Sequence, residues 1–231
     1  MRDFPDAIMH FAAGFGTRMG PLTKDRPKPL VTVAGRALLD HALALSDTIP
    51  LTRKVVNCHY FPDQIKAHLA QRSDITVIHE DGEILETGGG LKNALPALGR
   101  GPVFTTNTDA VWRGPNPLQA LLDAWKPDEM DALLLCVPKA KAIGHKGNGD
   151  FLIGEDRRLT YGPGEIYTGV QIIRTDRLAE IADTSFSLKL LWAKLLQDKR
   201  MFGLSYTGQW CDVGTPEGVA LAENMLGEAD V

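Results

Sequence analysis

FAAGFGTRMGPLTKDRPKPL, residues 11–30, is the stretch of this 231-residue sequence that decides how the rest is interpreted. It continues AIMHF (7–11), a short apolar run typical of a buried strand. Glycines directly after a strand let the backbone turn sharply and bring its N–H groups close to an anion, which at such loops is usually phosphate. The stretch therefore predicts a phosphate-binding loop at the end of a first strand.

The spacing of the glycines excludes two familiar phosphate loops. Gly14, Gly16 and Gly20 do not form the GxGxxG of dinucleotide-binding folds, because Met19 stands where the third glycine is required. They do not form the GxxxxGKS or GxxxxGKT pattern of P-loop proteins either. What remains is a glycine loop that carries Arg18.

Lys28 follows this loop between two prolines. Pro27 and Pro29 fix φ on both sides, so we expect Lys28 in a stiff extended segment that loses little freedom when it binds a charge. Glycine, proline and lysine also occur together in ordinary surface loops. Their combination with Arg18 directly after an N-terminal strand favours two fixed cations beside a phosphate site.

Strand-like and helix-like segments alternate along most of the chain, which predicts parallel strands joined by helical crossovers. We therefore expect an α/β sandwich with a ligand site at the carboxyl ends of its strands. The expected strands are 7–11, 54–58, 75–79, 102–107, 131–137 and 167–173, and the expected helices are 36–45, 62–72, 87–98, 116–125, 187–200 and 216–226.

The sequence predicts one domain over residues 1–231, since no linker, repeat or low-complexity tract interrupts it. The pattern changes around 138–166, where Gly, Lys and Asp are frequent and FLIG and RLTY are short strand candidates. This region predicts a small inserted β region or lid.

Composition narrows the class of protein. Apolar residues make up 44% and charged residues 23%, as in ordinary soluble globular proteins, and the net charge of −4 disfavours a nucleic-acid partner. Cys58, Cys136 and Cys211 form no CxxC pair, so neither a disulfide framework nor a cysteine zinc site is expected. No apolar run approaches the roughly 18 residues of a membrane span, and no leader is evident, so we expect a cytoplasmic protein.

The histidines form no recognisable metal-binding or catalytic pattern. We expect His59, His68, His79 and His145 to be surface or satisfied core residues.

AAGFGTRM with the downstream PKPL resembles the signature of the sugar-1-phosphate nucleotidyltransferases. LETGGGL (85–91), TTNTD (105–109) and WCDVGTPE (210–217) match that family in the same order, so the similarity covers nearly the whole chain. The resemblance implies the nucleotide-diphospho-sugar transferase fold, an α/β three-layer sandwich with a mixed, mostly parallel, Rossmann-like sheet. It also implies a nucleoside triphosphate and a sugar 1-phosphate as substrates.

The resemblance also implies which residues bind the nucleotide, with Arg18 and Lys28 as the catalytic cations. The nucleotide-binding residues would be Ala13, Gly14, Gly16, Thr17, Arg18, Lys28, Thr87 and Gly88. Thr87 is expected as a helix cap, and the amides of 88–90 are expected near the base edge. The glutamine that many relatives use for uracil or thymine is not evident in HEDGEILE (79–86), which leaves the base weakly defined.

Two aspartates are the expected metal ligands. Nucleotidyl transfer crowds several negative charges together, and Mg²⁺ binds carboxylate and phosphate oxygens while keeping waters. The family positions match Asp109, at the end of a strand, and Asp212, provided that their two strands are neighbours. The alternatives are a helix cap for Asp109 and a surface turn for Asp212. Thr108 stands where relatives usually carry glycine, which adds a β-carbon beside the metal ligand.

The sugar is expected to lie against Asn107, Asp150 and Gly169. Asn107 precedes Asp109 by two residues, so both side chains project to one face of an extended strand. GNGDF (147–151) resembles the G-D-F segment of the N-acetylmuramate 1-phosphate uridylyltransferases, by which Asp150 would bind the sugar; alternatively, the segment is a hairpin turn.

These observations predict a Mg²⁺-dependent nucleotidyltransferase in a monomer or homodimer. UTP and N-acetylmuramic acid 1-phosphate are the favoured substrates, which suggests a role in cell-wall recycling. The alternatives within the enzyme class are mannose or glucose 1-phosphate as the acceptor, or phosphocholine cytidylyl transfer. A non-catalytic nucleotide-sugar sensor is the alternative from another class.

Overall fold

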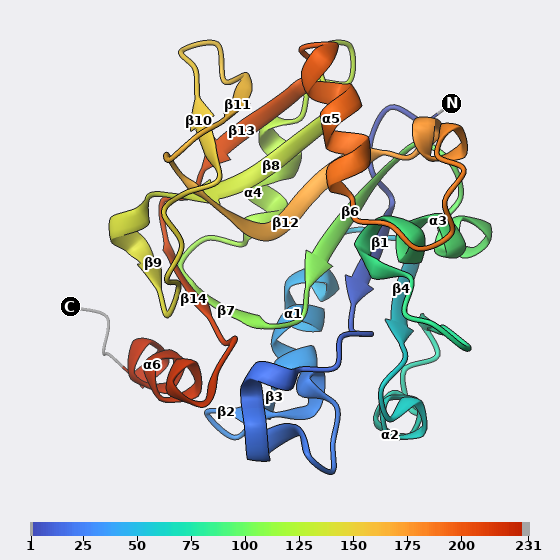
Figure 1. The fold of residues 1–231 in the computed structure, drawn as a ribbon, viewed down its shortest axis with the longest axis vertical. Helices are drawn as coiled ribbons and strands as arrows, with labels where there is room; N and C mark the ends of the chain where they lie inside the picture. Colours follow the sequence, from blue (N-terminus) through green and yellow to red (C-terminus); the bar gives the residue numbers. More distant parts are fainter. Residues whose placement is uncertain (1, 228–231) are drawn as a thin grey trace.

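Seven strands form one large sheet, and its strand order determines where a ligand site can form. The structure is a computed structural model that describes residues 2–227. The order is β13-β8-β12-β6-β1-β4-β5 (Figure 1). The strands are β1 (Ala7–Phe11), β4 (Arg53–Cys58), β5 (Ile75–His79), β6 (Pro102–Asn107), β8 (Ala132–Val137), β12 (Ile166–Arg174) and β13 (Met201–Ser205).

The sheet is mixed and mostly parallel, as the sequence predicted. β1 runs parallel to β4 and β6, β4 runs parallel to β5, and β13 runs parallel to β8. β12 is antiparallel to both of its neighbours, β6 and β8. The parallel strands β1, β4 and β6 therefore present their carboxyl ends at one edge, where ligands bind in such folds.

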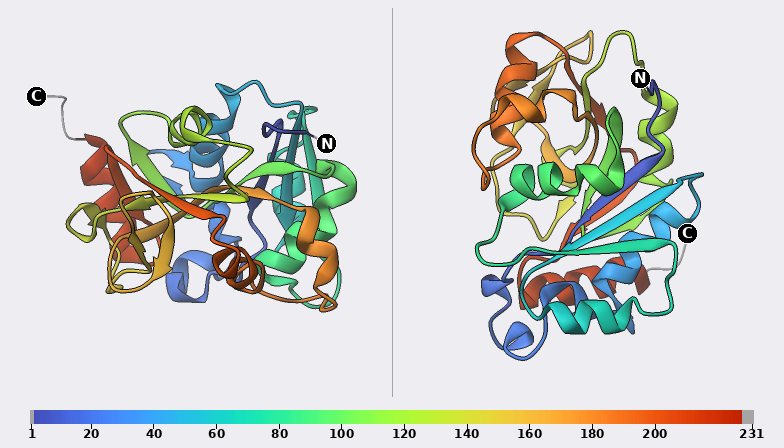
Figure 2. Two further views of the ribbon diagram at one scale, coloured as in Figure 1. Left: turned by 90° about the horizontal axis from the view of Figure 1, so that it is seen from above. Right: turned by 90° about the vertical axis from the view of Figure 1, so that its right-hand side faces the viewer.

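Helices cover both faces of this sheet (Figure 2), which confirms the three-layer sandwich. Ala7 and Met9 of β1 pack on α3 and α5, whereas Ile8 packs toward α4 on the opposite face, as the alternation of a strand requires. α1 and α2 cover the strands β1 and β4 on that second face. The helices are α1 (Leu38–Asp47), α2 (Pro62–His68), α3 (Glu86–Leu98), α4 (Pro117–Ala124), α5 (Lys189–Gln197) and α6 (Pro216–Gly227).

A second, three-stranded sheet extends from the carboxyl edge of the large one. Its order is β7 (Ala110–Arg113), β14 (Gln209–Asp212) and β9 (Ala142–Ile143), and α6 packs against it (Figure 1). The remaining short elements are η1 (Thr17–Thr23), η2 (Lys28–Leu30), β2 (Thr32–Val33), β3 (Arg36–Ala37), η3 (Lys139–Lys141), β10 (Phe151–Ile153), β11 (Leu159–Tyr161) and η4 (Asp176–Glu180).

The region 138–166 forms β9 and the hairpin β10–β11, so its short strand candidates are confirmed. The hairpin turns at residues 154–157, where the Arg157 N–H donates to the Gly154 carbonyl oxygen at 2.8 Å. The segment 148–150 precedes β10 and is not this turn. The hairpin-turn interpretation of GNGDF is therefore wrong, because the reversal of the chain comes later.

No helix within residues 2–227 is long and apolar enough to cross a membrane. The three cysteines are buried and unpaired, as expected from their spacing.

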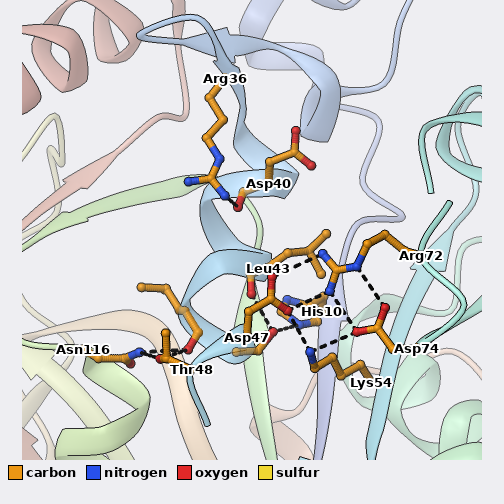
Figure 3. Close-up of polar contacts among 12 residues, drawn as sticks. His10, Arg36, Asp40, Leu43, Asp47, Thr48, Lys54, Arg72, Asp74 and Asn116 are labelled. Atoms are coloured by element: carbon orange, nitrogen blue, oxygen red, sulfur yellow. Dashed lines mark hydrogen bonds and ion pairs between the residues drawn. The ribbon is translucent and has the colours of Figure 1, made fainter.

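A network of charged side chains joins the end of α1 to β4 and to the start of β5 (Figure 3). Asp47 accepts from Lys54 and Arg72, each at 2.7 Å, and Asp74 accepts from the same two cations at 3.0 and 2.9 Å. His10 lies beside this network in β1, fully buried, with its Nε2 3.3 Å from the Ser46 hydroxyl. Burial, with Lys54 nearby, lowers the pKa of His10 to about 3.

His10 should make the protein sensitive to acid. The unfolded chain takes up a proton at His10 below its ordinary pKa of 6.5, whereas the folded chain does so only near pH 3. Above pH 6.5, His10 is neutral in both states and does not change the free energy of unfolding with pH. Between pH 6.5 and about pH 3, His10 lowers the free energy of unfolding by about 1.4 kcal/mol for each pH unit. Urea unfolding at neutral and mildly acidic pH should show a shallower pH dependence for His10→Leu than for the wild type. Equal slopes would contradict this role.

Candidate active site

An open cleft of about 210 Å³ lies at the carboxyl ends of β1, β4 and β6. It brings together six of the residues selected from the sequence, which are Ala13, Gly14, Lys28, Thr87, Asn107 and Asp109. Phe11, Ala12, Pro29, Asn57, Ile84, Glu86 and Thr108 complete the lining.

The glycine loop turns at Gly16 and leads directly into η1. Gly16 has φ 65°, the left-handed region that favours glycine, and a β-carbon there would lie 2.7 Å from Lys28 Cβ. Thr23 closes the loop by donating its hydroxyl to the Gly16 carbonyl at 3.0 Å. Thr17 and Arg18 occupy the first turn of η1 and are exposed. The expected sharp turn after β1 is present, and it packs directly on Lys28.

We expected Lys28 to lie in an extended segment, but it begins the 3₁₀ turn η2. The Val31 N–H donates to the Lys28 carbonyl at 2.9 Å, and Pro29 is tolerated because an amide in the first turn needs no partner. The turn buries the stem of Lys28 and leaves 11% of its side chain exposed. Its Nζ donates to Asp109 Oδ2 at 2.8 Å.

Asp109 and Asp212 meet because their strands are neighbours. β6 ends at Asn107, and Asp109 lies in the bend before β7. β7 pairs with β14 so that Asp212 is opposite Ala110, and the Val213 N–H donates to the Asp109 carbonyl at 2.8 Å. A strand follows Asp109, so the helix-cap alternative is excluded.

The two carboxylates repel each other, and cations surround them. Burial raises the pKa of Asp212, and Asp109 raises it further, while Lys28, Arg18 and His145 lower it. A β-carbon on Gly214 would lie 3.1 Å from Arg18 Nη1 and 3.2 Å from Asp212 Oδ1, so both side chains lie over this glycine. The sequence gave no role to His145, but its Nδ1 is 3.5 Å from Asp212 Oδ2.

Two acidic side chains are a suitable donor set for a divalent cation that also takes oxygens from phosphate and water. No group of three or more His, Cys, Asp or Glu side chains able to hold a metal occurs within residues 2–227. A metal ion here would thus take its protein ligands from Asp109 and Asp212. Their mutual repulsion gives the physical reason for such an ion to bind.

Thr108 anchors the bend that carries Asp109. Its hydroxyl donates to the Phe11 carbonyl at 2.8 Å, and the residue is 3% exposed. The hydroxyl of Thr108 therefore joins the bend after β6 to the end of β1.

Asn107 and Gly169 lie together at the edge of the cleft. Gly169 has φ 86° and lies where the register of β12 against β8 shifts between Tyr167 and Gln171. A β-carbon on Gly169 would be 2.7 Å from Asn107 Nδ2, so only glycine leaves room for this amide. The Asn107 side chain forms no hydrogen bond with the rest of residues 2–227, which leaves its amide available to a ligand.

Asp150 has a structural contact outside the cleft lining. Its Oδ2 accepts from the Tyr167 N–H at 2.9 Å, and its own N–H donates to the Glu165 carbonyl at 2.9 Å. The carboxylate therefore fixes the start of β12, the strand that carries Gly169.

The glycines of LETGGGL serve close packing, which differs from what we expected. The amides of Gly88 and Gly89 are not available to a ligand, because both donate to the Phe186 carbonyl, at 2.8 and 3.0 Å. A β-carbon on Gly89 would lie 2.1 Å from the Thr184 carbonyl oxygen. We define the segment 184–188, which crosses the start of α3, as the strap.

Thr87 is not the cap of α3, because that helix already begins at Glu86. Its hydroxyl accepts from the Leu188 N–H at 3.0 Å and so ties the strap to α3. Thr87 still lines the cleft, beside Glu86, which has the left-handed φ of 57°.

Two residues that sequence reasoning missed, Asn57 and Glu80, support the floor of the cleft. Asn57 Oδ1 accepts from the Ala12 N–H at 2.8 Å, and Asn57 Nδ2 donates to Glu80 Oε1 at 2.6 Å. Glu80 Oε2 accepts from the Leu85 N–H at 3.0 Å. A signal was available, since polar residues at the carboxyl ends of adjacent parallel strands meet at one edge of the sheet.

Comparison with known proteins identifies the family. The model of the MobA-like NTP transferase domain matches residues 11–159. N-acetylmuramate alpha-1-phosphate uridylyltransferase of Caulobacter vibrioides is 40% identical, over 99% of this chain and 100% of that protein. The protein of the same name from Neisseria meningitidis is 32% identical, over 95% and 97%.

The chain belongs to the MobA-like NTP transferase family. This NTP transferase also shares its fold with a putative glucose-1-phosphate thymidylyltransferase of Bacillus anthracis, with a TM-score of 0.80 and 12% identity over 97% of this chain and 96% of that one. The resemblance seen in the sequence is confirmed, and so is nucleotidyltransferase activity as the function class. Enzymes of this family generally use a divalent metal ion.

The packing of the strap on this NTP transferase can be tested at Gly89. Gly89→Ala should lower the free energy of unfolding by about 1–3 kcal/mol, because the methyl group overlaps the Thr184 carbonyl. It should also weaken nucleotide binding, since Glu86 and Thr87 move with the start of α3. Gly227→Ala is a matched control in α6, where a β-carbon meets nothing within 4 Å. Equal urea midpoints for Gly89→Ala and Gly227→Ala would show that the strap does not depend on this contact.

Proposed function

We propose that this protein transfers the uridylyl group of UTP to N-acetylmuramic acid 1-phosphate, with Mg²⁺, and releases pyrophosphate. The observation that carries the proposal is the grouping of two cations with two aspartates. Lys28 and Asp109 line the cleft, and Arg18 and Asp212 lie beside them. The choice of base and sugar is supported by the names of the two relatives, which align with nearly the whole chain.

The proposed reaction is an in-line displacement, in which an oxygen of the sugar phosphate attacks the α-phosphorus and pyrophosphate leaves. No covalent enzyme intermediate is needed, so the protein contributes positioning and charge stabilisation. Asp109 and Asp212 would hold the Mg²⁺ ion, which would neutralise phosphate charge. Arg18 and the loop amides from Ala13 to Thr17 bind the β- and γ-phosphates. Lys28 stabilises the charge that develops between the α-phosphate and the sugar phosphate.

The two substrates would occupy opposite ends of the cleft. The nucleoside lies against the loop residues Ala13 and Gly14 and against the start of α3 at Thr87. The sugar lies toward Asn107, beside Gly169. Asp150, in the inserted region, binds the sugar directly or positions the sugar site through its hydrogen bond to the Tyr167 N–H of β12. We place the activity in cytoplasmic recycling of the cell wall, in a single-domain monomer or homodimer.

Replacing the cationic side chain of Lys28 or of Arg18 should slow turnover without unfolding the protein. Lys28→Ala or Arg18→Ala should lower kcat by about 10²-fold or more, as expected for the loss of one oriented donor in a charge-stabilising site. Arg26→Ala is the matched control, because Arg26 is exposed on the same loop and pairs with Asp25. Near-normal turnover of a folded Lys28→Ala variant would exclude the role given to Lys28.

The substrates can be identified by pyrophosphate release. UTP, dTTP, GTP and CTP are each combined with N-acetylmuramate 1-phosphate, glucose 1-phosphate, mannose 1-phosphate and phosphocholine, with Mg²⁺ or with EDTA. We expect one strong signal, from UTP with N-acetylmuramate 1-phosphate, that EDTA abolishes. A strong signal from another pair would retain the reaction and overturn the choice of substrates. No signal in any pair would favour a non-catalytic nucleotide-sugar sensor.

A further inference from the structure

His145 is a polar side chain in contact with Asp212 that the proposed reaction leaves without a role. Its Nδ1 lies 3.5 Å from Asp212 Oδ2, and 25% and 20% of the two side chains are exposed. His145 comes from the segment between β9 and β10, in the inserted region. The inserted region therefore contacts Asp212, the aspartate that β14 carries.

The imidazole of His145 is held from two sides. The Trp210 ring lies 6.0 Å from it, centroid to centroid, and Trp210 and Asp212 share one face of β14. A β-carbon on Gly147 would lie 2.3 Å from His145 Nε2, so the chain folds closely over the ring. These contacts fix the ring with Nδ1 toward the carboxylate.

The backbone around His145 is anchored to the same strand. Ile143 of β9 pairs with Cys211, and a β-carbon on Gly144 would lie 2.5 Å from the Asp212 carbonyl oxygen. Lys146 Nζ lies 3.4 Å from Glu217 Oε2, in the first turn of α6. The segment therefore stays in place relative to Asp212.

We propose that His145 is a positioning residue that donates Nδ1–H to Asp212 and fixes the orientation of this carboxylate toward the metal ion. The inference rests on the proposed function, which makes Asp109 and Asp212 the ligands. Repulsion from Asp109 favours rotation of Asp212 away from its neighbour, and a fixed donor opposes that rotation. Hydrogen bonds of this kind orient metal ligands and contribute strongly to metal affinity.

The inferred role links the two halves of the site. His145 and Asp150 belong to one short segment, so the part of the chain assigned to the sugar also holds a metal ligand. The insertion would then support metal binding as well as sugar binding.

The role of His145 can be tested by titrating the protein with Mn²⁺ in the absence of substrates. Electron paramagnetic resonance measures the free ion at each step. His145→Ala should weaken Mn²⁺ binding by about 10–100-fold. His145→Asn should recover most of the affinity, because its amide nitrogen occupies the position of Nδ1. His145→Gln keeps the bulk against Trp210 but places its amide at the position of Nε2, so it should resemble the alanine variant.

His68→Ala is the matched control, since His68 contacts Asp40 at 2.7 Å and should leave Mn²⁺ affinity unchanged. In turnover assays, kcat of His145→Ala should return toward the wild-type value at saturating metal, with KM for the sugar phosphate unchanged.

The outcomes separate this inference from the proposed function. Wild-type Mn²⁺ affinity in a folded His145→Ala variant would overturn the role of His145 alone, and so would equal affinities of the alanine and asparagine variants. Wild-type protein that binds no Mn²⁺ would overturn the metal site itself.

Discussion

Two like charges held close together are the constraint on which the site depends. Asp109 and Asp212 are brought together by the pairing of β7 with β14, and their repulsion must be balanced by the surrounding structure. Lys28 supplies a cation at hydrogen-bond distance, Arg18 lies over Gly214 beside Asp212, and His145 approaches from the insertion. A substrate with phosphate groups and a divalent ion fits this arrangement, because it adds charges of both signs at once.

The site also depends on close approaches of neighbouring atoms to the backbone of three glycines. Gly16 packs against Lys28, Gly169 against Asn107, and Gly89 against the strap. In each case, a β-carbon would meet its neighbour at 2.9 Å or less. The glycines thus position functional side chains at a distance that other residues do not permit, and the buried chain of Asn57 and Glu80 fixes the floor beneath them.

Much of this arrangement could be predicted from local patterns. The strand AIMHF, the glycine loop and the alternation of strands with helices all follow from periodicity and turn chemistry, which short segments encode. Errors arose where a residue's role is set by a partner far along the chain. Thr87 was expected to cap α3 and instead binds Leu188. The error at Lys28 is local, because the 3₁₀ turn η2 forms where two prolines suggested extension.

The sequence by itself determined the α/β class, the loop with its two cations and the identity of the paired aspartates, because these depend on residue types at short spacings and on family motifs. Only the tertiary structure decided which of the polar residues meet. His145 looked like an ordinary surface or core histidine, yet the pairing of β9 with β14 places it beside Asp212. Strand order and register set such contacts, and they result from packing over the whole chain rather than from any one segment.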